Sequence, residues 1–110
     1  MRTIILALNT KNDEYVFKYA GIEPIKEFIG SYEGVEERSY LVEWSEDAIN
    51  LAKAYDQESI IVLKGGTAEL VILNDNSTVF EGKFKNVGNF MPDTAGWIYD
   101  IESGNYYILT

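Results

Sequence analysis

Residues 3–8 read Thr-Ile-Ile-Leu-Ala-Leu, an unbroken apolar run at the start of the chain. Isoleucine and threonine are β-branched and favour extended backbone, and an apolar run of this length is typical of a buried strand. A polar loop over residues 9–12 ends the run. The sequence therefore predicts that the first element is a strand of the hydrophobic core.

The segment after this strand has helical spacing with interruptions. Aromatic and aliphatic residues recur at helical intervals over residues 13–19, and a glycine and a proline follow them. Apolar residues at i, i+3 and i+4 then predict a second short helix over residues 23–29, which Gly30 would cap. We expect a short N-terminal helical segment over about residues 13–30.

The middle of the chain predicts a strand followed by the main helix. Residues 35–44 alternate between an apolar and a more polar face, as a strand does. Ser45 is a favourable N-cap, and Glu46 and Asp47 occupy the first turn, where the helix dipole favours acidic side chains. We expect the main helix over residues 45–56.

Beyond residue 58 the apolar pattern changes from helical to strand-like. A Gly-Gly pair tolerates the positive φ angles of a tight turn and joins two apolar runs, which predicts a hairpin. The predicted strands cover residues 59–63, 68–73, 78–84, 97–101 and 106–109. The fold class expected from this order is α+β, with a mixed or antiparallel sheet of about five to seven strands and the main helix on one face. Residues 1–110 are expected to form one domain.

Composition limits the chemistry that the chain can perform. It has no histidine and no cysteine, and 18 acidic residues against 9 basic ones give a formal charge of -9. Such an anion repels nucleic acid and acidic membranes and attracts basic surfaces. No metal-ligand motif or cofactor motif is present, so we expect neither a metal nor a cofactor. The opening apolar run is too short for a signal peptide or a membrane span, which predicts a cytoplasmic protein.

The central motifs resemble those of a known group of domains. Glu37-x-Ser39-Tyr40 on the predicted strand and Tyr55-x-Gln57 at the predicted helix end are similar to a family of small uncharacterised α+β domains of bacteria and phages. That family carries Glu-x-Ser-aromatic on a strand and aromatic-Gly-Gln at a helix end. The resemblance implies a bacterial or phage setting, host cytoplasm if phage-encoded, and a polar cluster of Glu37, Ser39 and Gln57.

Two groups of residues are candidates for binding a partner. Residues 33–58 hold eight acidic residues against two basic ones, and the terminal hairpin is rich in aromatic residues, which serve as anchors in protein interfaces. A solvated acidic face and aromatic closure of the core are the alternatives. The candidate partner-binding residues are Glu33, Glu36, Glu37, Glu43, Glu46, Asp47, Trp97, Tyr99 and Tyr106.

Two functional hypotheses follow from these observations. The first is a non-enzymatic acidic binding protein: a phage or mobile-element factor that mimics DNA and inhibits a basic, nucleic-acid-binding host defence protein of the CRISPR or restriction type. It would bind no nucleic acid and no membrane itself, and it could form a homodimer through the C-terminal hairpin. The second is a small ligand-binding or hydrolytic domain that uses carboxylates, for example Glu37 with Glu58. The first hypothesis predicts no catalytic residue.

Overall fold

The first strand, β1 (Arg2–Leu6), lies between two others and pairs antiparallel with both, in a computed structural model that describes residues 2–110. Eight antiparallel strands close into a barrel in the order β1-β3-β2-β7-β8-β6-β5-β4, and each pairs with two neighbours. The other strands are β2 (Lys26–Tyr32), β3 (Val35–Glu43), β4 (Ser59–Lys64), β5 (Thr67–Ile72), β6 (Ser77–Gly88), β7 (Gly96–Asp100) and β8 (Asn105–Leu109).

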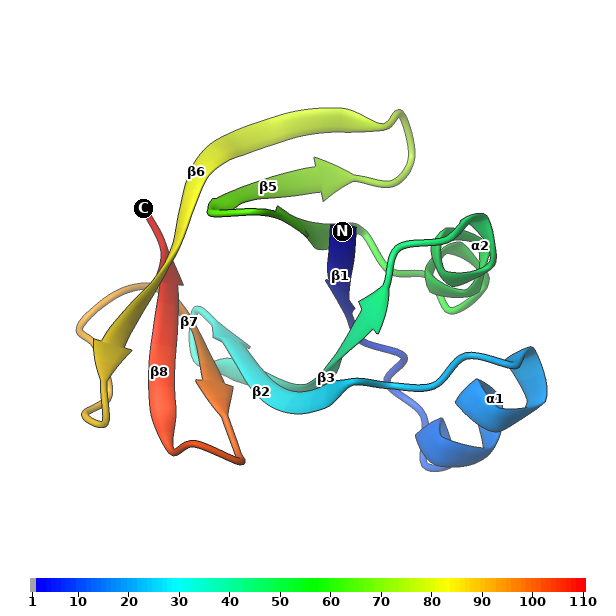
Figure 1. Ribbon diagram of the computed structural model, residues 1–110, viewed down its shortest axis with the longest axis horizontal. Helices are drawn as coiled ribbons and strands as arrows, with labels where there is room; N and C mark the ends of the chain where they lie inside the picture. Colours follow the sequence, from blue (N-terminus) through cyan, green and yellow to red (C-terminus); the bar gives the residue numbers. More distant parts are fainter. Residues whose placement is uncertain (1) are drawn as a thin grey trace.

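Two short helices lie outside the barrel. Helix α1 (Asp13–Ala20) follows β1, and helix α2 (Glu46–Ala54) follows β3. Figure 1 shows both helices on the same side of the ring of strands, next to β1 and β3. Gly21 ends α1 in the left-handed conformation, with φ of 71°, which glycine adopts without steric cost.

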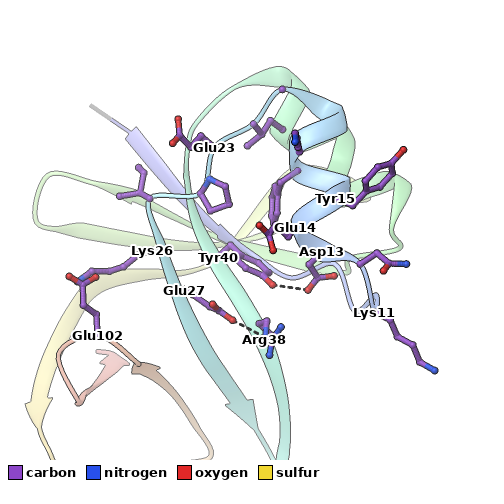
Figure 2. Close-up of a pocket in the computed structure, with 17 residues that line it drawn as sticks. Lys11, Asp13, Glu14, Tyr15, Glu23, Lys26, Glu27, Arg38, Tyr40 and Glu102 are labelled. Carbon is purple, nitrogen blue, oxygen red and sulfur yellow. Dashed lines mark hydrogen bonds and ion pairs between the residues drawn. The ribbon is translucent and has the colours of Figure 1, made fainter.

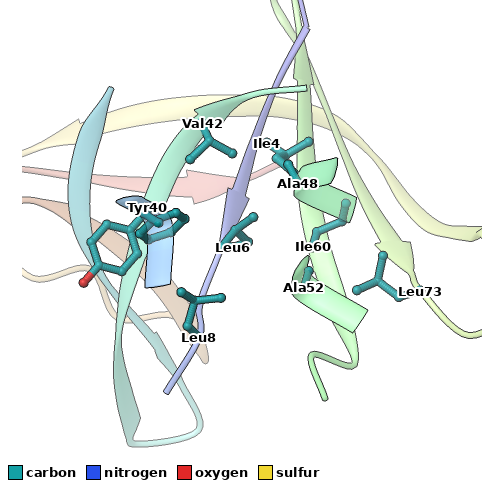
Figure 3. Packing of buried hydrophobic residues seen from close by; sticks show 10 residues of the cluster. Ile4, Leu6, Leu8, Tyr40, Val42, Ala48, Ala52, Ile60 and Leu73 are labelled. Atoms are coloured by element: carbon teal, nitrogen blue, oxygen red, sulfur yellow. The ribbon is translucent and has the colours of Figure 1, made fainter. Parts of the chain in front are cut away.

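The side of β1 that faces the helices forms the larger hydrophobic core. Ile4, Leu6 and Leu8 are almost completely buried there, and they pack with side chains of α1, α2, β3 and β4. Figure 3 shows Leu6 between the side chains of the neighbouring strands and of α2. The remaining buried members of this core are Phe17, Tyr40, Val42, Ala48, Ala52, Ile60 and Leu73.

The opposite side of β1 faces the inside of the barrel. Ile5 alternates with Ile4 and Leu6 and joins a second cluster with Phe28 and Ile98. Partly buried side chains from other strands complete this cluster: Leu41, Ile61, Leu63, Phe84 and Tyr107. Because these residues come from seven of the eight strands, the cluster can lie only in the barrel interior. The unbroken apolar run of residues 3–8 thus covers most of a strand buried on both faces and two buried residues that follow it.

The α+β fold class is wrong. The protein is a closed barrel of eight strands, not a sheet of five to seven strands covered by a main helix. The helix expected over residues 23–29 is also wrong, because this region enters strand β2. Strand β2 pairs with β3 on one edge and β7 on the other. Hydrogen bonds on both edges outweigh the short helical spacing of three apolar residues.

The helix predicted over residues 45–56 is present as α2, although it is one of two short helices. Its N-cap is Ser45, whose Oγ accepts a hydrogen bond from the Ala48 N–H at 3.0 Å. Ala48 and Ala52 are fully buried against β1, whereas Leu51 and Tyr55 are only partly buried. The expected hairpin around Gly65 joins β4 to β5. Within residues 2–110, no helix has both the length and the apolar character to cross a membrane.

Replacing Leu6 with alanine should destabilise the protein strongly. The Leu6 side chain is 2% exposed within the helix-covered core, so truncation would leave a cavity and cost about 2–5 kcal/mol in the free energy of unfolding. Urea denaturation would measure this loss. Phe90→Ala, at a loop residue that is 82% exposed, is the control and should change stability by less than about 0.5 kcal/mol. A loss below about 1 kcal/mol for Leu6→Ala would contradict this packing.

Candidate functional site

Two recesses of similar size are the candidate sites. The first is a cleft of about 1120 Å³ between α1, the loop after it, and the adjoining parts of β2 and β3. Figure 2 shows the charged and aromatic side chains that line it. They comprise four basic and five acidic residues: Lys11, Lys18, Lys26 and Arg38 with Asp13, Glu14, Glu23, Glu27 and Glu102. The cleft therefore has no strong preference for either sign of charge.

The central polar groups of this cleft already bond to one another. The Tyr40 hydroxyl donates to Asp13 Oδ2 at 2.9 Å, and Arg38 Nε lies 2.8 Å from Glu27 Oε1. Burial and the bond to Asp13 raise the pKa of Tyr40 to about 12, so its hydroxyl stays protonated. Asp13 Oδ1 also accepts from the Thr10 N–H and fixes the start of α1. These bonds attach α1 to the barrel.

A second ion pair at the edge of the same cleft ties the terminal hairpin to β2. Lys26 Nζ lies 2.7 Å from Oδ2 of Asp100, whose side chain is 1% exposed. Asp100 Oδ1 also accepts from the Glu102 N–H in the β7–β8 turn. Burial alone would raise the pKa of Asp100, but its bonds to Lys26 and Ser103 and the Lys26 charge outweigh burial and lower it. The ion pair therefore links the β7–β8 hairpin to β2 and stabilises the fold.

The second recess opens into the barrel and has a volume of about 1050 Å³. Its apolar wall comes from strands around the barrel, including Ile5, Ile61, Leu70, Ile98 and Tyr107. Its charged lining residues are all acidic: Glu33, Glu37, Asp56 and Glu58. Tyr32 and Phe80 are aromatic residues of its lining, and Trp97 borders it from a position on β7 that alternates with the inward-facing Ile98. An apolar recess with one sign of charge suits an organic cation that also carries an apolar or aromatic group.

The recess brings together the predicted polar cluster. Glu37 and Ser39 lie two residues apart on β3 and so face the same side, and Gln57 reaches the recess from the loop before β4. Gly30 is the pairing partner of Glu37 on β2, and a Cβ added there would lie 3.2 Å from Ser39 Oγ. A side chain at position 30 would therefore press against the Ser39 hydroxyl.

Gln57 lines the recess and also has a structural role. Its Oε1 accepts from the Ala7 N–H at 3.2 Å, and its own N–H donates to the Ala52 carbonyl. These bonds tie the end of β1 to the end of α2. Glu37 is exposed at the mouth of the recess, whereas Ser39 is 6% exposed. Glu37 and Ser39, rather than Gln57, are therefore the members of the cluster best placed to meet a ligand.

The predicted partner-binding residues do not share one surface. Glu36 and Glu37 are consecutive on β3 and point to opposite faces, Glu43 ends the same strand, and Glu46 and Asp47 lie in the first turn of α2. Only Glu33 and Glu37 of the acidic group line the barrel recess. The six acidic candidates are therefore divided among several elements, and their role in binding a partner stays a prediction.

The aromatic candidates form a cluster of their own. Tyr106 packs against both Trp97 and Tyr99, at ring-centroid distances of 5.1 Å and 4.8 Å, and all three side chains are partly buried. Strand β7 pairs with β2 and strand β8 with β6, so the hairpin offers no unpaired edge for a homodimer. The homodimer itself stays a prediction.

Sequence reasoning missed Tyr32, Phe80 and Glu33 as neighbours in one recess. The sequence prediction left Tyr32 and Glu33 in the loop between the helix expected over residues 23–29 and the strand expected from residue 35. It placed Phe80 on a strand but did not show which face of that strand lies inside the barrel. The signal that could have found Glu33 is the tight β2–β3 turn, where Glu33 has φ of 51° and Gly34 has φ of 82°. Across residues 2–110, no group of three or more acidic side chains lies close enough to hold a metal ion.

Comparison with known proteins shows the family. Residues 6–110 match the model of the S-Adenosylmethionine lyase family, and the chain therefore belongs to that family. A comparison with curated proteins finds no match. The family corrects the expectation of a non-enzymatic inhibitor, including the anti-defence and DNA-mimic interpretations, because a lyase family points to an enzyme. The alternative of a carboxylate-based hydrolytic domain is closer, but hydrolysis has no support either. The resemblance to uncharacterised bacterial and phage domains stays untested.

Asp100→Asn should remove part of the acid sensitivity of the fold. A lowered aspartate pKa contributes stability that is complete above the unfolded-state value of about 3.8 and is lost as pH falls through the folded-state pKa. At neutral pH the substitution should cost about 1–3 kcal/mol, because it replaces a charge-assisted bond with a neutral one. Unfolding free energies measured between about pH 7 and pH 2 should therefore converge with those of the unmodified protein at low pH.

Lys26→Met is the companion variant for this ion pair. It leaves the buried Asp100 carboxylate without its ammonium partner, so the pKa of Asp100 should rise and acid destabilisation should begin at higher pH. Parallel stability curves for all three proteins down to about pH 2 would contradict a stabilising role for the pair.

Proposed function

We propose that this protein is an S-adenosylmethionine lyase whose active site is the barrel recess. One observation carries the proposal: the recess combines four carboxylates, no lysine or arginine, and several aromatic rings, in a chain of the S-Adenosylmethionine lyase family. S-adenosylmethionine is a sulfonium cation that carries an adenine ring. Its two distinctive groups therefore correspond to the two kinds of side chain in the recess.

The chemistry of a sulfonium explains why the chain needs neither histidine nor cysteine. When a C–S bond of the substrate breaks, its electron pair stays on sulfur, which becomes a neutral thioether. In a lyase reaction the other fragment either closes a ring, when its own carboxylate attacks the carbon that sulfur leaves, or loses a proton to a base and forms a double bond; no water is consumed. The positive charge already makes sulfur a good leaving group, so no covalent nucleophile is required. The enzyme's main tasks are to bind and orient the cation.

Glu37 is the residue that we assign to the sulfonium. It lines the recess, lies two residues along β3 from the β2–β3 turn, and is on the same face as the nearly buried Ser39. Its carboxylate would attract the cation, and the Ser39 hydroxyl could donate to a polar group of the substrate. Glu58 and Asp56, which also line the recess, add to its negative potential.

The cytoplasmic location expected from the sequence is part of this proposal. A permanently charged substrate crosses lipid poorly, so the enzyme must work in the compartment where S-adenosylmethionine is made.

Incubation with S-adenosylmethionine should consume the substrate and release a neutral thioether that mass spectrometry detects. S-adenosylhomocysteine has the same adenine but no positive charge on sulfur, and it should survive under the same conditions. Glu37→Gln keeps the size of the side chain and removes its charge, so kcat/KM should fall by about tenfold or more.

Glu36→Gln is the matched control, because Glu36 is the next residue on β3 and points to the other face. It should keep kcat/KM within about twofold of the unmodified enzyme. Absence of thioether release by the unmodified protein would reject the proposed function. Equal losses for both variants would reject the assignment of Glu37.

A further inference from the structure

The pairing of strands arranges the mouth of the recess in layers. Tyr32 of β2 lies opposite Val35 of β3 on one side and Gly96 of β7 on the other. Two residues further into the barrel, Gly30 lies opposite Glu37 and Ile98. Ile98 belongs to the interior cluster, so residues of the same parity, Tyr32 and Gly96 included, face the recess.

The Tyr32 ring lies over a glycine. A Cβ added to Gly96 would be 3.2 Å from Tyr32 Cδ2 and 3.9 Å from its Cε2, so the ring covers the place where a side chain would stand. Gly96 therefore supports one part of the ring with bare backbone. The Tyr32 side chain is nevertheless 64% exposed and lines the recess, which leaves much of its aromatic surface free. Such a ring is a ready platform for another planar group.

The backbone around this ring is held in place. The Glu33 N–H donates to the Ala95 carbonyl at 2.7 Å, which ties the β2–β3 turn to the segment before β7. On that segment, the Thr94 hydroxyl donates to the Gly96 carbonyl at 2.8 Å. The backbone next to Tyr32 is thus ordered before any ligand arrives, which lowers the entropic cost of binding at this position.

The two layers place Tyr32 and Glu37 at different depths of the recess. Glu37 lies one layer, about 7 Å along the strand, below the layer of Tyr32. In S-adenosylmethionine the ribose holds the adenine and the sulfonium apart. We infer that Tyr32, supported by Gly96, binds the adenine ring by stacking and sets the position of the sulfonium beside Glu37. This inference rests on the proposed function, and it assigns Tyr32 as the specificity residue for the nucleoside.

Two fragments of the substrate separate the roles of the two residues. Adenosine carries the base and ribose without sulfonium, and S-methylmethionine carries a sulfonium without nucleoside. Equilibrium dialysis would measure the dissociation constant of each. Tyr32→Ala should weaken adenosine binding by about tenfold and change S-methylmethionine binding by less than about twofold, because stacking on one base contributes about that much. Glu37→Gln should show the reverse pattern.

Two further variants test the stacking surface itself. Tyr32→Phe keeps the ring and should bind adenosine within about twofold of the unmodified protein, because base stacking uses the face of the ring. Gly96→Ala places a methyl group against the ring and should weaken adenosine binding while Tyr32 is still present. Circular dichroism would check that each variant keeps its fold, as expected for the Tyr32 variants because that side chain is exposed.

The outcomes distinguish this inference from the proposed function. Adenosine binding that depends on Tyr32, without cleavage of S-adenosylmethionine, would support the nucleoside platform and reject the lyase. Cleavage whose KM is unchanged by Tyr32→Ala would support the lyase and overturn the platform. The platform is also overturned if the unmodified protein fails to bind adenosine at millimolar concentration, or if Tyr32→Ala leaves adenosine binding unchanged.

Discussion

The burial of strand β1 on both faces is the constraint on which the rest of the structure depends. One face of the strand packs under α1 and α2, and the other packs into the barrel interior. A strand at the edge of an open sheet would leave backbone groups unpaired, but β1 pairs with β3 and β4 and thereby closes the ring. The closure of the barrel and both hydrophobic cores therefore depend on the same strand, β1.

Closure also determines where a ligand can bind. The helices cover the outside of β1 and β3, where Tyr40 bonds to Asp13 of α1. The ion pair between Lys26 and Asp100 holds the β7–β8 hairpin to β2. The polar groups in these two places stabilise the fold. The barrel recess differs because, among the described residues that line it, all four charged ones are acidic. The chain carries a formal charge of -9, and an apolar recess lined by acidic side chains attracts cations.

Composition alone misled the functional hypothesis. Lack of histidine and cysteine argues against proton transfer at neutral pH and covalent catalysis, but a sulfonium substrate needs neither, because its own charge activates the leaving group. The acidic span also suggested one binding face. Alternation along β3 instead sends Glu36 and Glu37 to opposite sides, and only the second meets the recess. The functional meaning of the charge depends on which few carboxylates converge.

The sequence by itself determined the buried first strand, the N-cap at Ser45, the hairpin at Gly65 and the association of Glu37 with Ser39, because each depends on neighbours in the chain. Only the tertiary structure decided that residues 26–32 form a strand, because the hydrogen bonds that hold β2 come from β3 and from the distant β7. It also decided which face of each strand is inside the barrel. Inward and outward positions follow from register, and register between distant strands is set when the barrel closes and buries Ile5 with Ile98.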